Sequence, residues 1–131
     1  MIGTVLDASA FLAYFGNEPG ADAVEQAIAG GACLSMVNWA EVLSKIAERG
    51  GDVATVERVS SELVGLAVDL MEFTQEDAQI VAALRPKTSK QGLSLGDRAC
   101  LALALRTGLP AMTMDRTWSN LKIGVSIKIV R

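Results

Sequence analysis

Short apolar runs alternate along the chain with longer segments that carry apolar residues at helical spacing. The first run ends abruptly at Asp7, and the fourth ends in the same way at Asp115, so each is interpreted as a buried strand with a carboxylate at its carboxyl end. Together the runs predict five strands, at Ile2–Leu6, Ala32–Met36, Leu66–Phe73, Ala111–Met114 and Ser126–Val130.

The segments between the runs predict six helices. Pro19 suits the first turn of one helix, Asp52 is a good capping residue for another, and glycines follow several of them. The predicted helices cover Ala8–Phe15, Pro19–Ile28, Val37–Arg49, a stretch from Asp52 to about Leu63, Thr74 to near Pro86, and Leu95–Arg106. The stretch Lys87–Leu95 is predicted to be a polar loop.

This alternation of strands and helices predicts an α/β fold with a parallel sheet and helices on both faces. In such sheets, ligands bind at the carboxyl ends of the strands, where the strand order reverses. Asp7 and Asp115 both lie at such ends. The length of 131 residues predicts a single domain, 1–131, and no internal repeat is evident.

The composition predicts a compact protein, because 50% of the residues are hydrophobic and 21% are charged. No apolar stretch approaches the roughly 20 residues of a membrane span. The chain also begins without the basic segment of a secretory leader, so we expect a cytoplasmic protein. Cys33 and Cys100 are interpreted as buried thiols rather than as a disulfide.

The chain contains no histidine. This excludes Ser-His-Asp and Cys-His catalysis, histidine acid–base chemistry and His-ligated zinc sites. An enzyme with this composition has to rely mainly on carboxylates, hydroxyls, lysine or a bound metal.

Charge is distributed unevenly along the chain. Residues 1–77 contain thirteen acids and three bases, whereas residues 78–131 contain nine bases and only two acids, Asp97 and Asp115. The basic half suggests an anionic partner, although halves that interleave in space would cancel the asymmetry, and both arrangements fit the sequence.

Four carboxylates are candidates for one shared site. Asp7 and Asp115 follow strands, Glu41 borders the apolar face of its helix, and Asp97 lies near the start of the most hydrophobic helix. Asp97 alone is equally well explained as a helix-capping or first-turn acid. Four converging carboxylates would repel one another, and a hard cation such as Mg²⁺ or Mn²⁺ would remove that repulsion and support phosphodiester hydrolysis.

Four segments in order resemble the PIN domain, and most closely the VapC toxins of toxin–antitoxin pairs. They are Val5–Ala10, Asn38–Val42, Leu95–Ala104 and Thr113–Arg116, which span residues 5 to 116. The resemblance implies a three-layer α/β/α sandwich with a mostly parallel sheet of about five strands. It also implies Mg²⁺- or Mn²⁺-dependent cleavage of RNA, a homodimer and a small antitoxin partner that covers the site.

The same resemblance implies roles for individual residues. Asp7, Glu41 and Asp97 would hold the principal metal ion, directly or through water, and Asp115 would complete the site more loosely. The hydroxyl groups of Ser9 and Thr113 would orient these carboxylates, although Thr113 is also an ordinary strand residue.

Basic residues near the acids are candidate phosphate contacts. The segment Arg85–Gly92 carries three bases and no acid, so we expect Lys87 and Lys90 to line the RNA path, with Arg98 and Arg116 beside the acids. For each base, a solvated surface position explains the sequence equally well.

Other readings are weaker. A haloacid-dehalogenase-type phosphatase would need an aspartate where Ser9 stands. The rival from another class is a PIN-like fold that acts only as a binding module, and a metal titration that finds no site would favour it. Trp39 and Trp118 are interpreted as packing residues rather than as base-stacking platforms.

Overall fold

The computed structural model describes residues 2–131 and contains five short strands. Each strand lies within one of the apolar runs and is shorter than the run by one to four residues. The strands are β1 (Thr4–Leu6), β2 (Ala32–Ser35), β3 (Val68–Met71), β4 (Ala111–Thr113) and β5 (Ile127–Ile129).

Six α-helices and one short 3₁₀ helix connect the strands. They are α1 (Ala8–Phe15), α2 (Ala21–Ala29), α3 (Met36–Glu48), α4 (Val53–Val64), α5 (Gln75–Thr88), α6 (Leu95–Thr107) and the 3₁₀ helix η1 (Arg116–Asn120). The Asp52 side chain caps α4 by accepting a hydrogen bond from a backbone N–H group, as its sequence position predicted. The Thr74 side chain caps α5 in the same way.

The five strands form one sheet in the order β3-β2-β1-β4-β5, and every neighbouring pair is parallel. The prediction of a mostly parallel sheet is therefore confirmed. The chain moves outward from β1 to β3 on one side and from β4 to β5 on the other, so the strand order reverses between β1 and β4. Asp7 follows β1 directly, and Asp115 follows β4 after one intervening residue, Met114.

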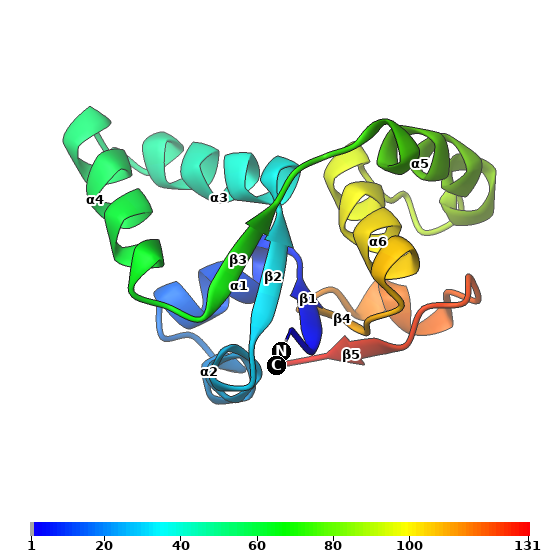
Figure 1. Ribbon diagram of the computed structural model, residues 1–131, viewed down its shortest axis with the longest axis horizontal. Coiled ribbons are helices and arrows are strands. Elements are labelled where there is room, and N and C mark those ends of the chain that lie inside the picture. Colours follow the sequence, from blue (N-terminus) through cyan, green and yellow to red (C-terminus); the bar gives the residue numbers. More distant parts are fainter. Residues whose placement is uncertain (1) are drawn as a thin grey trace.

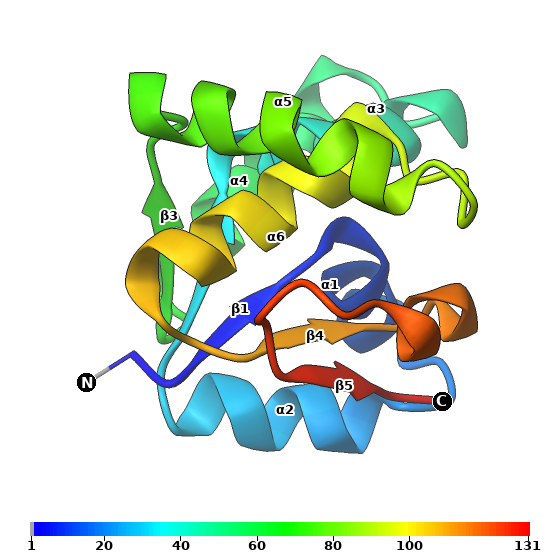
Figure 2. The same cartoon turned by 90° about the vertical axis from the view of Figure 1, so that its right-hand side faces the viewer.

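Helices cover both faces of this sheet, which makes the predicted three-layer sandwich. Figure 1 shows α3 and α4 on one side of the strands and α5 and α6 on the other. Figure 2 shows α5 and α6 above β1, β4 and β5, with α2 below them. Successive residues of a strand point to opposite faces. Accordingly, Val5 belongs to one hydrophobic core and Leu6 to the other.

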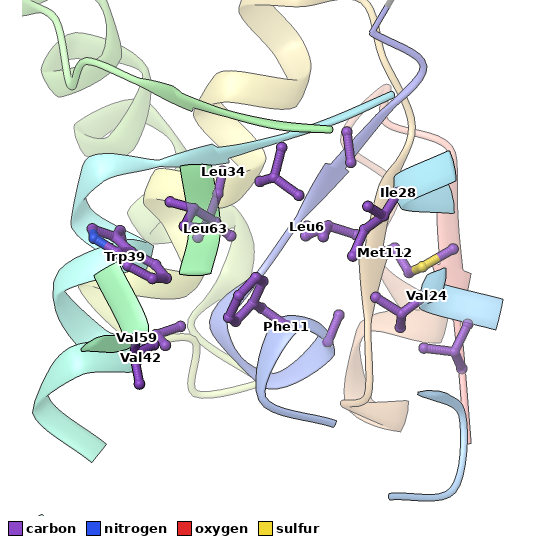
Figure 3. Close-up of a cluster of buried hydrophobic side chains, with 14 residues drawn as sticks. Leu6, Phe11, Val24, Ile28, Leu34, Trp39, Val42, Val59, Leu63 and Met112 are labelled. Atoms are coloured by element: carbon purple, nitrogen blue, oxygen red, sulfur yellow. The ribbon is translucent and has the colours of Figure 1, made fainter. Parts of the chain in front are cut away.

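The larger core lies between the sheet and α1–α4 (Figure 3). Phe11 and Trp39 meet there edge to face, with ring centroids 5.5 Å apart. Trp39 is only 5% exposed, and Trp118 is fully buried in the opposite core. Both tryptophans therefore pack in the interior, as we had interpreted them, and neither presents a surface for base stacking.

The second core joins the sheet to α5 and α6. Cys33 and Cys100 are both buried there as free thiols, which confirms their interpretation. Arg106 Nε donates to the buried Asp77 carboxylate at 2.6 Å, which ties α6 to the first turn of α5. This pair anchors the helix that carries Asp97.

The sequence misplaced the end of α5 and missed η1. The helix continues through Pro86 to Thr88. The polar loop predicted to begin at Lys87 therefore begins two residues later, at Ser89. Leu84 and Thr88 are buried, and the Thr88 hydroxyl donates to the Leu84 carbonyl at 2.9 Å. Packing of this last turn therefore outweighs the tendency of Pro86 to end a helix.

Within residues 2–131, no helix has the length and apolarity required to cross a membrane.

Candidate active site

Asp7 lies at the carboxyl end of β1 and begins α1. Its Oδ1 accepts hydrogen bonds from Ala10 N at 2.8 Å and Ser9 Oγ at 2.7 Å. Its Oδ2 accepts from Thr113 Oγ1, on β4, at 2.5 Å. The aspartate therefore caps a helix, and it also links the two central strands at the point where their order reverses.

Burial sets the protonation of Asp7. Its side chain is only 4% exposed, and this burial raises its pKa to about 6 from an ordinary value of 3.8. The hydrogen bonds from Thr113, Ala10 and Ser9 oppose this increase. The charge of Asp97 adds to it, so the two carboxylates are within electrostatic reach of each other.

Asp115 is joined to Asp7 through Thr113. The Asp115 N–H donates to Thr113 Oγ1 at 3.0 Å, and Ser9 Oγ accepts from Met114 N at 3.0 Å. The Asp115 side chain caps η1 by accepting from Thr117 N at 2.9 Å. Ser9 and Thr113 thus lie between the carboxyl ends of β1 and β4 and contact both segments.

Glu41 projects from α3 against the first turn of α6. Its Oε1 accepts from Asn38 Nδ2 at 2.8 Å. The carboxylate lies so close to Gly96 that a Cβ atom there would overlap it. Since Asp97 is the next residue, the Glu41 carboxylate lies against the turn of α6 that carries a second candidate acid.

Asp97 belongs to a capping box at the start of α6. Its Oδ2 accepts from Ser94 N at 2.9 Å, while Ser94 Oγ accepts from Asp97 N at 3.1 Å. The interpretation of Asp97 as a helix-capping residue is therefore confirmed. It accounts for only one carboxylate oxygen, because within residues 2–131 Oδ1 accepts no hydrogen bond.

The charges of three of the four candidate acids act on one buried thiol. Burial raises the pKa of Cys100 well above its ordinary value, and the charges of Asp7, Asp97 and Glu41 raise it further. Cys100 lies one turn after Asp97 on α6, fully buried beneath the first turn. All three carboxylates are therefore within electrostatic reach of Cys100.

The donor chemistry suits a hard divalent cation. As the side chains stand, no three His, Cys, Asp or Glu residues within residues 2–131 form a closed ligand cluster. However, the hydrogen bonds described above leave Glu41 Oε2, Asp97 Oδ1 and Asp115 Oδ2 unengaged. Carboxylate oxygens are the ligands that Mg²⁺ and Mn²⁺ prefer. The chemistry of these donors fits such an ion, and the side chains would have to move to bind it.

The structure corrects the expectation for Arg98. This side chain is 6% exposed, and its Nη1 donates to the Val81 carbonyl, on α5, at 2.9 Å. Arg98 therefore holds α5 and α6 together and does not face an RNA backbone. Lys87, Lys90 and Arg116 are exposed, as a phosphate contact requires.

Sequence reasoning missed two residues that contact the candidate acids. Asn38 lies three positions before Glu41, a spacing that places both on one helix face, and this signal was sufficient to find it. Gly96 gave a weaker signal, since a glycine inside a helix disfavours the helix and so suggests a packing reason.

The chain belongs to the PIN domain family, whose model matches residues 4–124. A search among curated protein sequences finds no significant match.

Several solved structures share the fold. DNA-bound VapBC from Salmonella typhimurium superposes with a TM-score of 0.73 at 14% identity, over 98% of each chain. VapC20 from Mycobacterium tuberculosis, described as a Sarcin-Ricin loop cleaving toxin, gives a TM-score of 0.72 at 13% identity, over 95% of this chain and 99% of that one. A toxin–antitoxin complex from Klebsiella pneumoniae gives a TM-score of 0.69 at 20% identity, over 94% of this chain and 95% of that one. At these identities the similarity establishes the fold.

Proposed function

We propose that this PIN domain protein is a Mg²⁺- or Mn²⁺-dependent ribonuclease and the toxin of a toxin–antitoxin pair. The observation that carries the proposal is the link from Asp7 through Thr113 to Asp115 at the carboxyl ends of the central strands, with Glu41 packed against the turn of α6 that carries Asp97. Carboxylates without a histidine or lysine partner are suited to holding a cation.

Asp7, Glu41 and Asp97 would hold the ion, and Asp115 would complete the site from its position just before η1. A bound divalent ion would lower the pKa of a water molecule and stabilise the charge that develops on a phosphodiester. Ser9 and Thr113 fix the orientation of Asp7 by donating to its two oxygens. Asn38 similarly fixes one oxygen of Glu41. These bonds reduce the reorganisation that ion binding requires.

The RNA backbone would be held by exposed cations. Lys87 lies in the last turn of α5 and Lys90 follows it, shortly before the first turn of α6 where Asp97 lies. Arg116 follows Asp115 directly. Because these side chains are solvated, they would contribute through phosphate contacts and would not select a base sequence.

The proposed partners come from the structural relatives. Several of these are described as VapBC or FitAB complexes, and some are bound to DNA. We therefore expect a cognate antitoxin to bind this chain and cover its acids, and we expect the toxin to be a homodimer in the cytoplasm. Expression without the antitoxin should arrest growth, and an Asp97→Asn form should be harmless.

Cleavage of a fluorescein-labelled hairpin RNA by the antitoxin-free protein tests the activity. We expect cleavage with Mn²⁺ or Mg²⁺ and none in excess EDTA. Asp7→Asn should lower the rate by orders of magnitude, while the matched control Asp22→Asn, at an exposed position on α2, should not. Cleavage that persists in EDTA would contradict the proposal. If the protein binds RNA but neither cleaves it nor binds Mn²⁺, the catalytically silent binding module would be favoured.

A further inference from the structure

The Asn38 side chain bridges two helices at the candidate site. Its Nδ2 donates to Glu41 Oε1 at 2.8 Å and to the Gly96 carbonyl at 2.9 Å. A primary amide has two N–H donors, so both are used. One side chain thus contacts a candidate acid on α3 and the residue that precedes another candidate acid on α6.

The orientation of this amide is fixed by its surroundings. Asn38 is 1% exposed, and its Oδ1 is buried with no hydrogen-bond partner within the described residues. Turning the amide over would direct Oδ1 at two oxygen acceptors and leave both of them without a donor. An unpaired buried acceptor is costly, so its presence here calls for an explanation beyond packing.

Gly96 allows the contact to form. The nearest atoms to a Cβ built at this residue are the three carboxyl atoms of Glu41, all closer than a real Cβ atom tolerates. The Glu41 carboxylate therefore occupies the space that any other residue would fill. Asn38 draws α3 and α6 together, and Gly96 leaves room for the acid between them.

We propose that Asn38 and Gly96 form a clasp that sets the separation between Glu41 and Asp97, with Asn38 as a positioning residue of the site. The proposal rests on the ribonuclease function proposed above. Asn38 acts through Glu41 and through the first turn of α6, because its amide contacts an acid on one side and the neighbour of an acid on the other.

Mn²⁺ binding measured by titration calorimetry tests the clasp. Asn38→Ala should weaken Mn²⁺ binding by roughly tenfold or more, and raising the Mn²⁺ concentration should restore part of the cleavage of a hairpin RNA. Val24→Ala, at a buried position on α2, controls for a general loss of stability. Unchanged Mn²⁺ affinity in Asn38→Ala would overturn the proposal.

Gly96→Ala separates positioning from folding. The added methyl group meets the flexible end of Glu41, so the helix should keep or gain thermal stability while Mn²⁺ affinity falls. Gly30→Ala is the matched control, since the nearest atom to its Cβ lies at an ordinary 3.7 Å. Wild-type Mn²⁺ affinity in Gly96→Ala would also contradict the clasp.

A metal-free measurement keeps the clasp testable if the proposed function fails. Wild-type protein that neither binds Mn²⁺ nor cleaves RNA would exclude the nuclease. A double-mutant cycle of Asn38→Ala and Glu41→Ala, measured by urea unfolding in EDTA, still reports on the pair. The two changes should be non-additive in the unfolding midpoint. Additive shifts would show that the two side chains do not act together.

Discussion

The Thr113 hydroxyl donates to Asp7 Oδ2 across the junction of β4 and β1, at 2.5 Å. Thr113 is fully buried, and its oxygen also accepts from the Asp115 N–H. This one hydroxyl therefore orients a carboxylate at the end of β1 and fixes the backbone of a second acid after β4. It stands at the point where the sheet reverses its order.

Replacing this hydroxyl should damage the site with little change in shape. Thr113→Val removes the donor to Asp7 and should raise the pKa of Asp7 further, because the Thr113 bond lowers it. We expect a loss of about 10- to 100-fold in metal affinity or cleavage rate. Thr107→Val, which removes a hydroxyl bonded only to α6 carbonyls, is the control. Equal activity of the two variants would show that Thr113 does not orient Asp7.

The raised pKa of Asp7 makes a prediction about pH. Between about pH 4 and 6 the folded metal-free protein retains a proton on Asp7 that the unfolded chain has lost. The free energy of unfolding should therefore fall as pH rises through this window. The full loss of stability from ionising Asp7 is present above about pH 6. The pKa shift of Asp7 corresponds to a loss of about 2–3 kcal/mol in the free energy of unfolding. Asp7→Asn should remove this loss, while its amide oxygen can still accept the hydrogen bond from Ala10 N.

Urea unfolding in EDTA at pH 4, 5, 6 and 7.5 measures this effect. The quantity of interest is the wild-type value minus the Asp7→Asn value, because other carboxylates cancel in the difference. That difference should become more negative with pH. A flat difference would mean that Asp7 is better solvated than its 4% exposure indicates.

Asp97 combines a capping role with its proposed role in catalysis, and the two can be separated. Ser94→Ala removes the hydroxyl that accepts from Asp97 N, so it should lower stability by about 1 kcal/mol and leave most of the cleavage activity. Asp97→Asn should abolish cleavage. Its stability should change little, because relief of repulsion with Asp7 opposes a weaker cap. Loss of activity in Ser94→Ala to the level of Asp97→Asn would assign Asp97 to capping alone.

The exposed lysines should control RNA affinity and not metal affinity. Lys87→Ala with Lys90→Ala should weaken binding of a hairpin RNA in EDTA and reduce the slope of log affinity against log salt by about 1 to 2. Mn²⁺ affinity should be unchanged. Lys45→Ala, at an exposed position paired with Glu48 on α3, is the control. An unaltered salt slope in the double variant would place the RNA elsewhere.

The sequence predicted the frame of the site well because its signals are local or topological. The bounds of α1, at Ala8–Phe15, followed from apolar spacing between Asp7 and Gly16. The proximity of Asp7 and Asp115 followed from strand polarity, since the carboxyl ends of parallel strands share one edge of the sheet.

Features that depend on tertiary packing were not predictable in this way. The sequence suggests that Arg98 is a surface base. In the structure it is buried between α5 and α6, where it donates a hydrogen bond to the Val81 carbonyl. The 3₁₀ helix η1 depends on the Asp115 cap and the buried Trp118. The bond from Asn38 to Gly96 joins residues 58 positions apart, which periodicity does not detect.

Thermal melting with and without Mn²⁺ tests the central claim, that Asp7 and its neighbouring acids share a divalent cation. Without metal, Asp7→Asn should melt above the wild type, because it removes a charge whose burial is costly and which the charge of Asp97 disfavours further. With saturating Mn²⁺ the order should reverse, since the ion stabilises the wild type by mass action and the variant much less. Melting curves that Mn²⁺ leaves unmoved, or moves equally in both proteins, would contradict the shared metal site.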